Sequence, residues 1–170
     1  MDRIDERAFR EWSAQHLAPL VRFAFALTHD EGHAEDLVES ALVRTLLAWP
    51  EVVTTGDPEC FTRRTMVQEL ASRWRRPRAT AETAVAMQRI PADAFAPADA
   101  ELVERDRVWR ELVDLHPHQR AVLVLRYYED RSDAEVAAIL DFRVDTVRNI
   151  AATAIETLRA GEIVDRRVSP

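Results

Sequence analysis

The side chains best suited to act on another molecule lie within two helical turns near the end of the chain. They are Arg143, Thr146, Arg148 and Asn149. An arginine can donate to a guanine edge or a phosphate, and an asparagine can bond an adenine edge. This group therefore indicates a helix that contacts duplex DNA, if the preceding residues hold that helix in place.

The preceding residues have the pattern of a helix-turn-helix across 115–159. A turn at Asp141 places Ala137 at the close contact between two helices. Asp is one of the few side chains that adopt the left-handed backbone of such a turn, although Gly adopts it more easily. Helical hairpins are common, so a DNA reader and a plain structural hairpin both remain open. The apolar positions of the pattern are Val136, Leu140, Phe142, Val147 and Ile150.

A second candidate surface is the basic helix predicted over 58–76. A basic cluster with an interleaved aromatic suits a phosphate track and the stacking of unpaired bases. Cations also complement the carboxyl end of a helix, so a purely structural role is the alternative. The candidate residues of this helix are Arg63, Arg64, Arg73, Trp74, Arg75 and Arg76.

A third candidate surface is acidic and belongs to the helix predicted over 34–48. Glu35, Asp36 and Glu39 lie on adjacent turns beside its apolar residues, which include Leu37 and Val38. Most such faces are simply solvated. The alternative is a docking site for a basic partner.

The elements that must position these residues are helical. The chain is 47% hydrophobic with only three glycines, which favours helices joined by short loops. We expect an all-α fold with two small helical domains, 1–76 and 105–170, joined by a flexible acidic linker at 77–104. A short helix over 81–89 is possible within that linker.

Local signals refine the predicted helices. The first spans about 6–27, and Pro19 is expected to split or bend it. The stretch 54–58 has turn chemistry, with Asp57 capping the next helix and Pro58 in its first turn. The apolar run 121–125 is predicted to be helical because it lies in a longer 3.6-residue pattern. Trp12, Trp49 and Trp109 are expected to pack in a core or between domains.

Charge and composition exclude several classes of protein. The net charge is −7, and each of the three segments has more acids than arginines, which argues against a general nucleic-acid binder. Any DNA contact therefore needs local arginine clusters and a partner. Cys60 is the single cysteine, so no intrachain disulfide is possible. His29 and His33 lack further ligands for a metal site.

The expected location is the cytoplasm. The start of the chain lacks the order of a signal peptide, and no stretch reaches the roughly 18 apolar residues of a membrane span. No nucleophile–base pattern, phosphate loop or catalytic carboxylate pair stands out. We therefore expect neither an enzyme nor a bound cofactor.

Four sequence blocks, in this order, resemble the extracytoplasmic-function (ECF) sigma factors, the small two-domain proteins that direct bacterial RNA polymerase to promoters. HAEDLVESAL (33–42) is similar to their core-polymerase-binding helix, and FTRRTMVQELASRWRR (61–76) to their −10 recognition helix. LHPHQRAVLVLRYYED (115–130) resembles the start of their second domain, and SDAEVAAILDFRVDTVRN (132–149) occupies their −35 reader. The match is nearest the actinobacterial type without a fused extra domain.

The resemblance implies partners for the three surfaces. Glu35, Asp36 and Glu39 would face core RNA polymerase, and Glu39 with Ser40 stands where Gln-Glu is usual. The basic helix and a loop at 51–57 would handle the melted −10 strand of promoter DNA, with Gln68 as a further contact at a position where the family often has Asn. An anti-sigma factor or another protein regulator is a possible further partner.

The predicted reader helix departs from the family pattern. Arg143 stands at the usual Ser cap and Asp145 replaces Gly. Positions that are often basic in the family hold Ile150, Thr153 and Thr157 here. Glu156 adds a negative charge to the same helix. The resemblance therefore implies a sigma factor with weak DNA affinity of its own. The alternative is a degenerate sigma-like regulator that acts by protein contact, with Ile150 as an exposed anchor.

Overall fold

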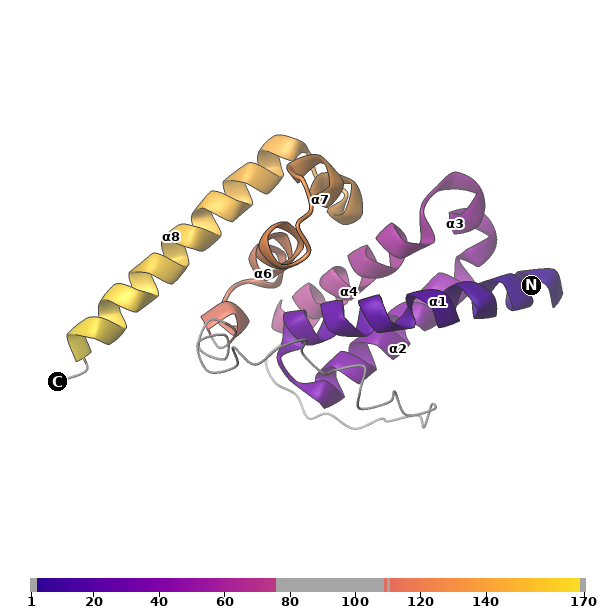
Figure 1. Cartoon of the computed structure of the whole chain (residues 1–170), viewed down its shortest axis with the longest axis horizontal. Helices are drawn as coiled ribbons and strands as arrows, with labels where there is room; N and C mark the ends of the chain where they lie inside the picture. Colours follow the sequence, from indigo (N-terminus) through magenta and orange to yellow (C-terminus); the bar gives the residue numbers. More distant parts are fainter. Residues whose placement is uncertain (1–2, 76–108, 110, 169–170) are drawn as a thin grey trace. The chain divides into compact units, whose positions relative to one another are not determined.

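The computed structural model describes residues 3–75, 109 and 111–168, and these form two compact units within Met1–Pro97 and Ala98–Pro170 (Figure 1). The described residues are helical, with no strand among them. The predicted linker at 77–104, the possible helix at 81–89 and Arg76 lie outside the described residues.

The first unit is built around α1 (Arg3–Thr28), which runs without interruption through Pro19. The predicted split at this proline is therefore wrong. Tertiary packing outweighs the lost backbone hydrogen bond, because the residues that follow Pro19 form the centre of the core. Leu20, Val21, Phe23, Ala24 and Leu27 are fully buried.

The second helix, α2 (Glu31–Leu47), begins three residues earlier than the apolar pattern predicts. His29 adopts a positive φ of 52° and turns the chain after α1. The Asp30 carboxylate then accepts a 2.8 Å hydrogen bond from the His33 backbone N–H, which caps α2. Leu37 and Val38 face the core as predicted, and Ala41 is buried with them.

A short helix, α3 (Trp49–Thr55), takes the place of the loop predicted around 51–57. Pro50 stands in its first turn, where a missing N–H costs nothing. Trp49 is buried, and its ring lies 5.2 Å from that of Phe9 and 5.4 Å from that of Trp12, measured between centroids. This aromatic packing fixes the segment, and it agrees with the packing role predicted for Trp12 and Trp49.

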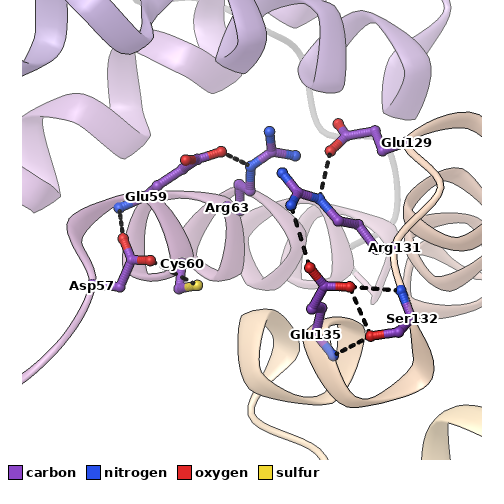
Figure 2. Close-up of polar contacts among 8 residues, drawn as sticks. All are labelled: Asp57, Glu59, Cys60, Arg63, Glu129, Arg131, Ser132 and Glu135. Atoms are coloured by element: carbon purple, nitrogen blue, oxygen red, sulfur yellow. Dashed lines mark hydrogen bonds and ion pairs between the residues drawn. The ribbon is translucent and has the colours of Figure 1, made fainter.

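The basic helix, α4 (Pro58–Arg75), packs against α2. Asp57 accepts a 2.8 Å hydrogen bond from the Glu59 backbone N–H, as the predicted cap requires (Figure 2). Met66, Val67 and Ala71 form the buried side of α4. The opposite side of the helix is left at the surface.

The second unit begins with helical residues 111–113 and continues through α6 (Pro117–Leu123) and a π-helical turn, η2 (Val124–Tyr128). The run 121–125 is therefore helical, as predicted. Arg120 is buried, and its guanidinium donates to the backbone carbonyls of Leu112, Val113 and Leu115. These bonds satisfy carbonyls at the end of the preceding helical turn.

The helix-turn-helix of this unit consists of α7 (Asp133–Leu140) and α8 (Val144–Val168). Asp141 lies between them with φ 60° and ψ 46°, the left-handed conformation that the sequence predicts. Ser132 and Glu135 form a reciprocal capping box at the start of α7 (Figure 2). Val136, Ala137, Leu140 and Val147 are buried, whereas Phe142 and Ile150 are half-buried.

Trp109 in this unit also has a packing role. Its ring meets that of Tyr128 edge-on, with 5.3 Å between centroids. Tyr128 itself is 49% exposed, so the contact lies at the surface of the unit. Trp109 packs within its own unit, but it is half-buried and its contact with Tyr128 does not lie in a core, which is one of the two places that the sequence predicts.

Candidate nucleic-acid interface

The outward face of α8 holds the four residues that the sequence singled out. Val147, Ala151 and Ala154 are buried at helical spacing and fix the inward side. Outside this buried side, Arg143, Thr146, Arg148 and Asn149 are all exposed. The fold therefore presents an arginine, a hydroxyl and an amide on α8, with a second arginine just before its first turn.

Arg148 is held by two carboxylates. Its Nε donates to Asp133 Oδ2 at 3.1 Å, and its Nη1 donates to Asp145 Oδ1 at 3.4 Å. The Arg148 side chain still has 61% of its surface exposed. Sequence reasoning missed Asp133, because the residue lies 15 positions earlier and on the other helix of the pair.

The start of α8 lacks a side-chain cap. The helix begins at Val144, so Arg143 occupies the capping position, and its guanidinium has no acceptor to offer the free N–H groups. Asp145 stands in the first turn, where a negative charge is favourable. This placement gives Asp145 a role in helix stability besides any effect on DNA.

Two exposed threonines of α8 are bonded to the backbone of their own helix. The hydroxyls of Thr153 and Thr157 donate back to the carbonyls of Asn149 and Thr153, at 3.0 and 2.9 Å. Ile150 is half-buried, so the prediction of an exposed apolar anchor there is wrong. Ile150 lies one turn from the buried Val147 and Ala154 and shares part of their contact with the fold.

On α4 the structure removes one predicted contact residue from the surface. Arg63 is 2% exposed, and its Nε lies 2.9 Å from Glu59 Oε1 (Figure 2). Its guanidinium carbon also lies 4.8 Å from the centroid of the Phe23 ring. The prediction that Arg63 binds DNA is therefore not supported, because this arginine is a core residue.

The other candidates on α4 are more accessible. Gln68 and Arg75 are exposed, Trp74 is 50% exposed, and Arg64 is half-buried. Arg73 lies 2.6 Å from Glu69, and Glu69 also accepts a 2.5 Å hydrogen bond from Ser40 on α2. Glu69 thus connects the basic surface of α4 to α2.

The acidic face of α2 is open. Asp36 is exposed, Glu35 and Glu39 are half-exposed, and within the described residues none of these carboxylates forms an ion pair. Val43 and Leu47 continue along the helix with 41% and 78% of their surface exposed. Acidic and apolar side chains therefore lie together on one surface of α2.

The remaining candidates for chemistry are unremarkable in their surroundings. Burial and the neighbouring carboxylate of Asp57 raise the pKa of the Cys60 thiol to about 11, which keeps it protonated near neutral pH. His33 Nδ1 lies 3.0 Å from the capping Asp30. Among the described residues, no three metal-ligating side chains come together. None of the helices among the described residues is long and apolar enough to cross a membrane.

Family models match both units. Sigma-70 region 2 matches residues 13–80, and sigma-70 region 4 matches residues 112–160. The chain is 31% identical over 158 residues to an RNA polymerase sigma-E factor of Streptomyces coelicolor, covering 93% of this chain and 87% of that protein. It is 32% identical over 155 residues to the ECF RNA polymerase sigma factor SigL of Mycobacterium tuberculosis, covering 85% and 83%.

A solved structure shares the fold. CnrH, determined in complex with the cytosolic domain of CnrY, superposes with a TM-score of 0.59 at 23% identity, over 94% of this chain and 90% of that one. Together with the sequence relatives, these matches show that the chain belongs to the ECF sigma factors. It is a transcription-initiation factor that binds core RNA polymerase and promoter DNA, and its family is not enzymatic.

Proposed function

We propose that this sigma factor attaches to core RNA polymerase through the acidic face of α2. The observation that carries the proposal is that Glu35, Asp36 and Glu39 are accessible at the surface and have no cationic partner in the described chain. A basic partner surface would pair with these charges. Charge complementarity of this kind orients the two proteins and raises their association rate. The exposed Val43 and Leu47 beside them supply apolar area to bury.

We assign promoter contact to two helices. The outward face of α8 offers Arg143, Thr146, Arg148 and Asn149 to the −35 element, with Arg148 and Asn149 suited to base edges. On α4, the proposed contacts with the −10 strand are Arg64, Gln68, Arg73, Trp74 and Arg75, with Arg76 beyond the described residues. Arg63 is left out because it is buried.

Regulation by a protein of the anti-sigma kind is part of the same proposal. The motive is CnrH, which shares this fold and was solved with the cytosolic domain of CnrY. A subunit of RNA polymerase acts where the polymerase and the chromosome are, so we also propose a cytoplasmic location.

The test is binding to purified core polymerase in the absence of DNA. We expect the Glu35→Lys/Asp36→Lys double variant to bind at least tenfold more weakly, because two attractive charges become repulsive at a charged interface. The matched control is Glu156→Lys, which reverses an exposed acid on α8 and should leave this affinity within about twofold.

The fold of each variant is checked by circular dichroism and thermal unfolding. Wild-type affinity in a folded Glu35→Lys/Asp36→Lys variant would show that the polymerase binds elsewhere on the chain. A separate run-off transcription assay asks whether the wild-type chain selects promoters. That assay tests the DNA contacts independently of the α2 site.

A further inference from the structure

Asp133 lies between two arginines that come from different helical elements. Its Oδ2 accepts a 3.1 Å hydrogen bond from Arg148 Nε on α8. Its Oδ1 lies 3.0 Å from Arg126 Nε in the π-helical turn η2, with the distance of an ion pair but not the alignment of a hydrogen bond. The Asp133 side chain is only 21% exposed, so one carboxylate links η2, α7 and α8.

The contacts of Arg148 leave the end of its guanidinium available. A guanidinium has five N–H groups, and here Asp133 takes the one on Nε while Asp145 takes one on Nη1. Three N–H groups on the two terminal nitrogens remain. Arginine reads guanine through two N–H groups that donate to O6 and N7, so the part needed for that contact stays free.

We propose that Asp133 is a positioning residue that sets the specificity of promoter recognition by holding Arg148 for a guanine edge. This inference rests on the proposed contact between Arg148 and the −35 element. A long arginine side chain without a fixed partner reaches phosphates as easily as bases, and phosphate contacts carry no sequence information. Asp133 restricts Arg148 to one orientation before DNA arrives, as the supporting groups of a precise site do.

The position of Arg126 supports this role. Arg126 is on the far side of the carboxylate from Arg148, and its side chain is 29% exposed. Its contact with Oδ1 holds the Asp133 carboxylate in place from that side, so that Asp133 can in turn fix Arg148. An isolated surface ion pair does little, but several charges connected in a network contribute more.

The simple alternative is that Asp133 only repels DNA. In that case its removal would strengthen binding to every sequence by a similar factor, because phosphate repulsion does not depend on the base pair. A positioning role predicts a different signature. The preference at one base pair of the −35 element falls, whereas the activity averaged over sequences changes little.

The test is run-off transcription by reconstituted holoenzyme on a promoter library with a randomised −35 element. Wild type should prefer guanine at one position by about tenfold or more, and Arg148→Ala should abolish that preference. Asp133→Asn should reduce it at least threefold at the same position. Adding Asp133→Asn to Arg148→Ala should change nothing further, because the two residues act together.

Two further variants complete the design. Glu156→Gln removes one exposed negative charge from α8 outside the cluster, so any change there should be equal for all sequences. Arg126→Gln releases Asp133 from the other side and should reduce the same preference about twofold. If circular dichroism shows that Asp133→Asn is not folded, the Arg126→Gln variant tests the positioning role of Asp133 in its place.

Each outcome has one meaning. A uniform rise in transcription for Asp133→Asn, with the base preference intact, would overturn the positioning role. A guanine preference that survives in Arg148→Ala would overturn it as well. In that case, promoter-directed transcription by the wild type would still support the sigma-factor function. Loss of promoter-directed transcription in the wild type itself would instead count against the proposed DNA contacts.

Discussion

At the scale of single residues, Arg63 shows how a basic side chain on a DNA-binding helix can belong to the core. It lies on the side of α4 that packs inward, where Glu59 neutralises its charge and the face of the Phe23 ring covers it. A buried cation of this kind depends on its partner, because an unpaired charge is costly in the interior. Its contribution is therefore to the stability of the first unit.

The corresponding prediction concerns Arg63→Met. The substitution keeps an unbranched side chain but leaves Glu59 without its cation, so we expect the free energy of unfolding to fall by about 2 kcal/mol. Urea unfolding measures this. The control is Arg75→Met at the exposed end of α4, which should change stability by less than about 0.5 kcal/mol. Equal, small effects in both variants would contradict the core role of Arg63.

At the scale of elements, the start of α2 depends on the Asp30 cap. The hydrogen bond from the His33 backbone N–H is the main reason that the pKa of Asp30 lies below its ordinary value of 3.8. A lowered folded-state pKa means that the ionised form stabilises the fold above the unfolded pKa. That stabilisation is lost as the pH falls through the folded-state pKa.

We expect Asp30→Ala to lower the free energy of unfolding by about 1 kcal/mol at pH 7. The difference from wild type should shrink as the pH falls below the ordinary value of 3.8, because the unfolded chain then binds a proton at Asp30 more readily than the folded chain does. Urea unfolding at pH 7 and near pH 3 measures both effects. Asp30→Asn is the control, since an Asn cap does not titrate. A loss that stays constant down to pH 3 would argue against the carboxylate as the source.

The turn between α7 and α8 gives a second prediction at this scale. Asp141 has a Cβ in the left-handed region, which costs free energy that glycine avoids. We expect Asp141→Gly to raise the free energy of unfolding by about 0.5 kcal/mol and Asp141→Val to lower it by about 1–2 kcal/mol. Thermal unfolding of the two variants checks the order, and a more stable Val variant would rule out backbone strain as the controlling factor.

At the scale of the whole molecule, charge limits what the free chain does alone. The net charge is −7, and the arginines suited to DNA lie among acids such as Asp133, Asp145 and Glu69. Non-specific affinity for duplex DNA comes mainly from neutralising phosphates, so an acidic protein gains little of it. The polymerase must supply the remaining affinity for the promoter.

We therefore expect little binding of the isolated chain to duplex DNA in a gel-shift assay at physiological salt. The holoenzyme should shift promoter DNA under the same conditions. The reason is the long-range repulsion between an acidic protein and the phosphates, which the polymerase overcomes. Tight, sequence-specific binding by the free chain would instead indicate a self-sufficient repressor or activator.

The sequence by itself determined the helical periodicity and the main caps and turns. The spacing of Val136, Ala137, Leu140 and Val147 predicted both helices of the helix-turn-helix, and Asp141 in the left-handed turn agrees with that prediction. Local rules act over a few residues, which is why the cap at Asp57 also appears in the structure as predicted. The same rules identified the residues on the outward face of α8.

Tertiary structure decided the features that depend on distant partners. Pro19 does not interrupt α1 because the following turns fill the core, and Trp49 packs with aromatics from α1, so that a helix replaces the expected loop. The burial of Arg63 against Phe23 and the link from Asp133 to Arg148 join residues from different helices. No periodicity along one helix contains such contacts, because they exist only once the helices have packed.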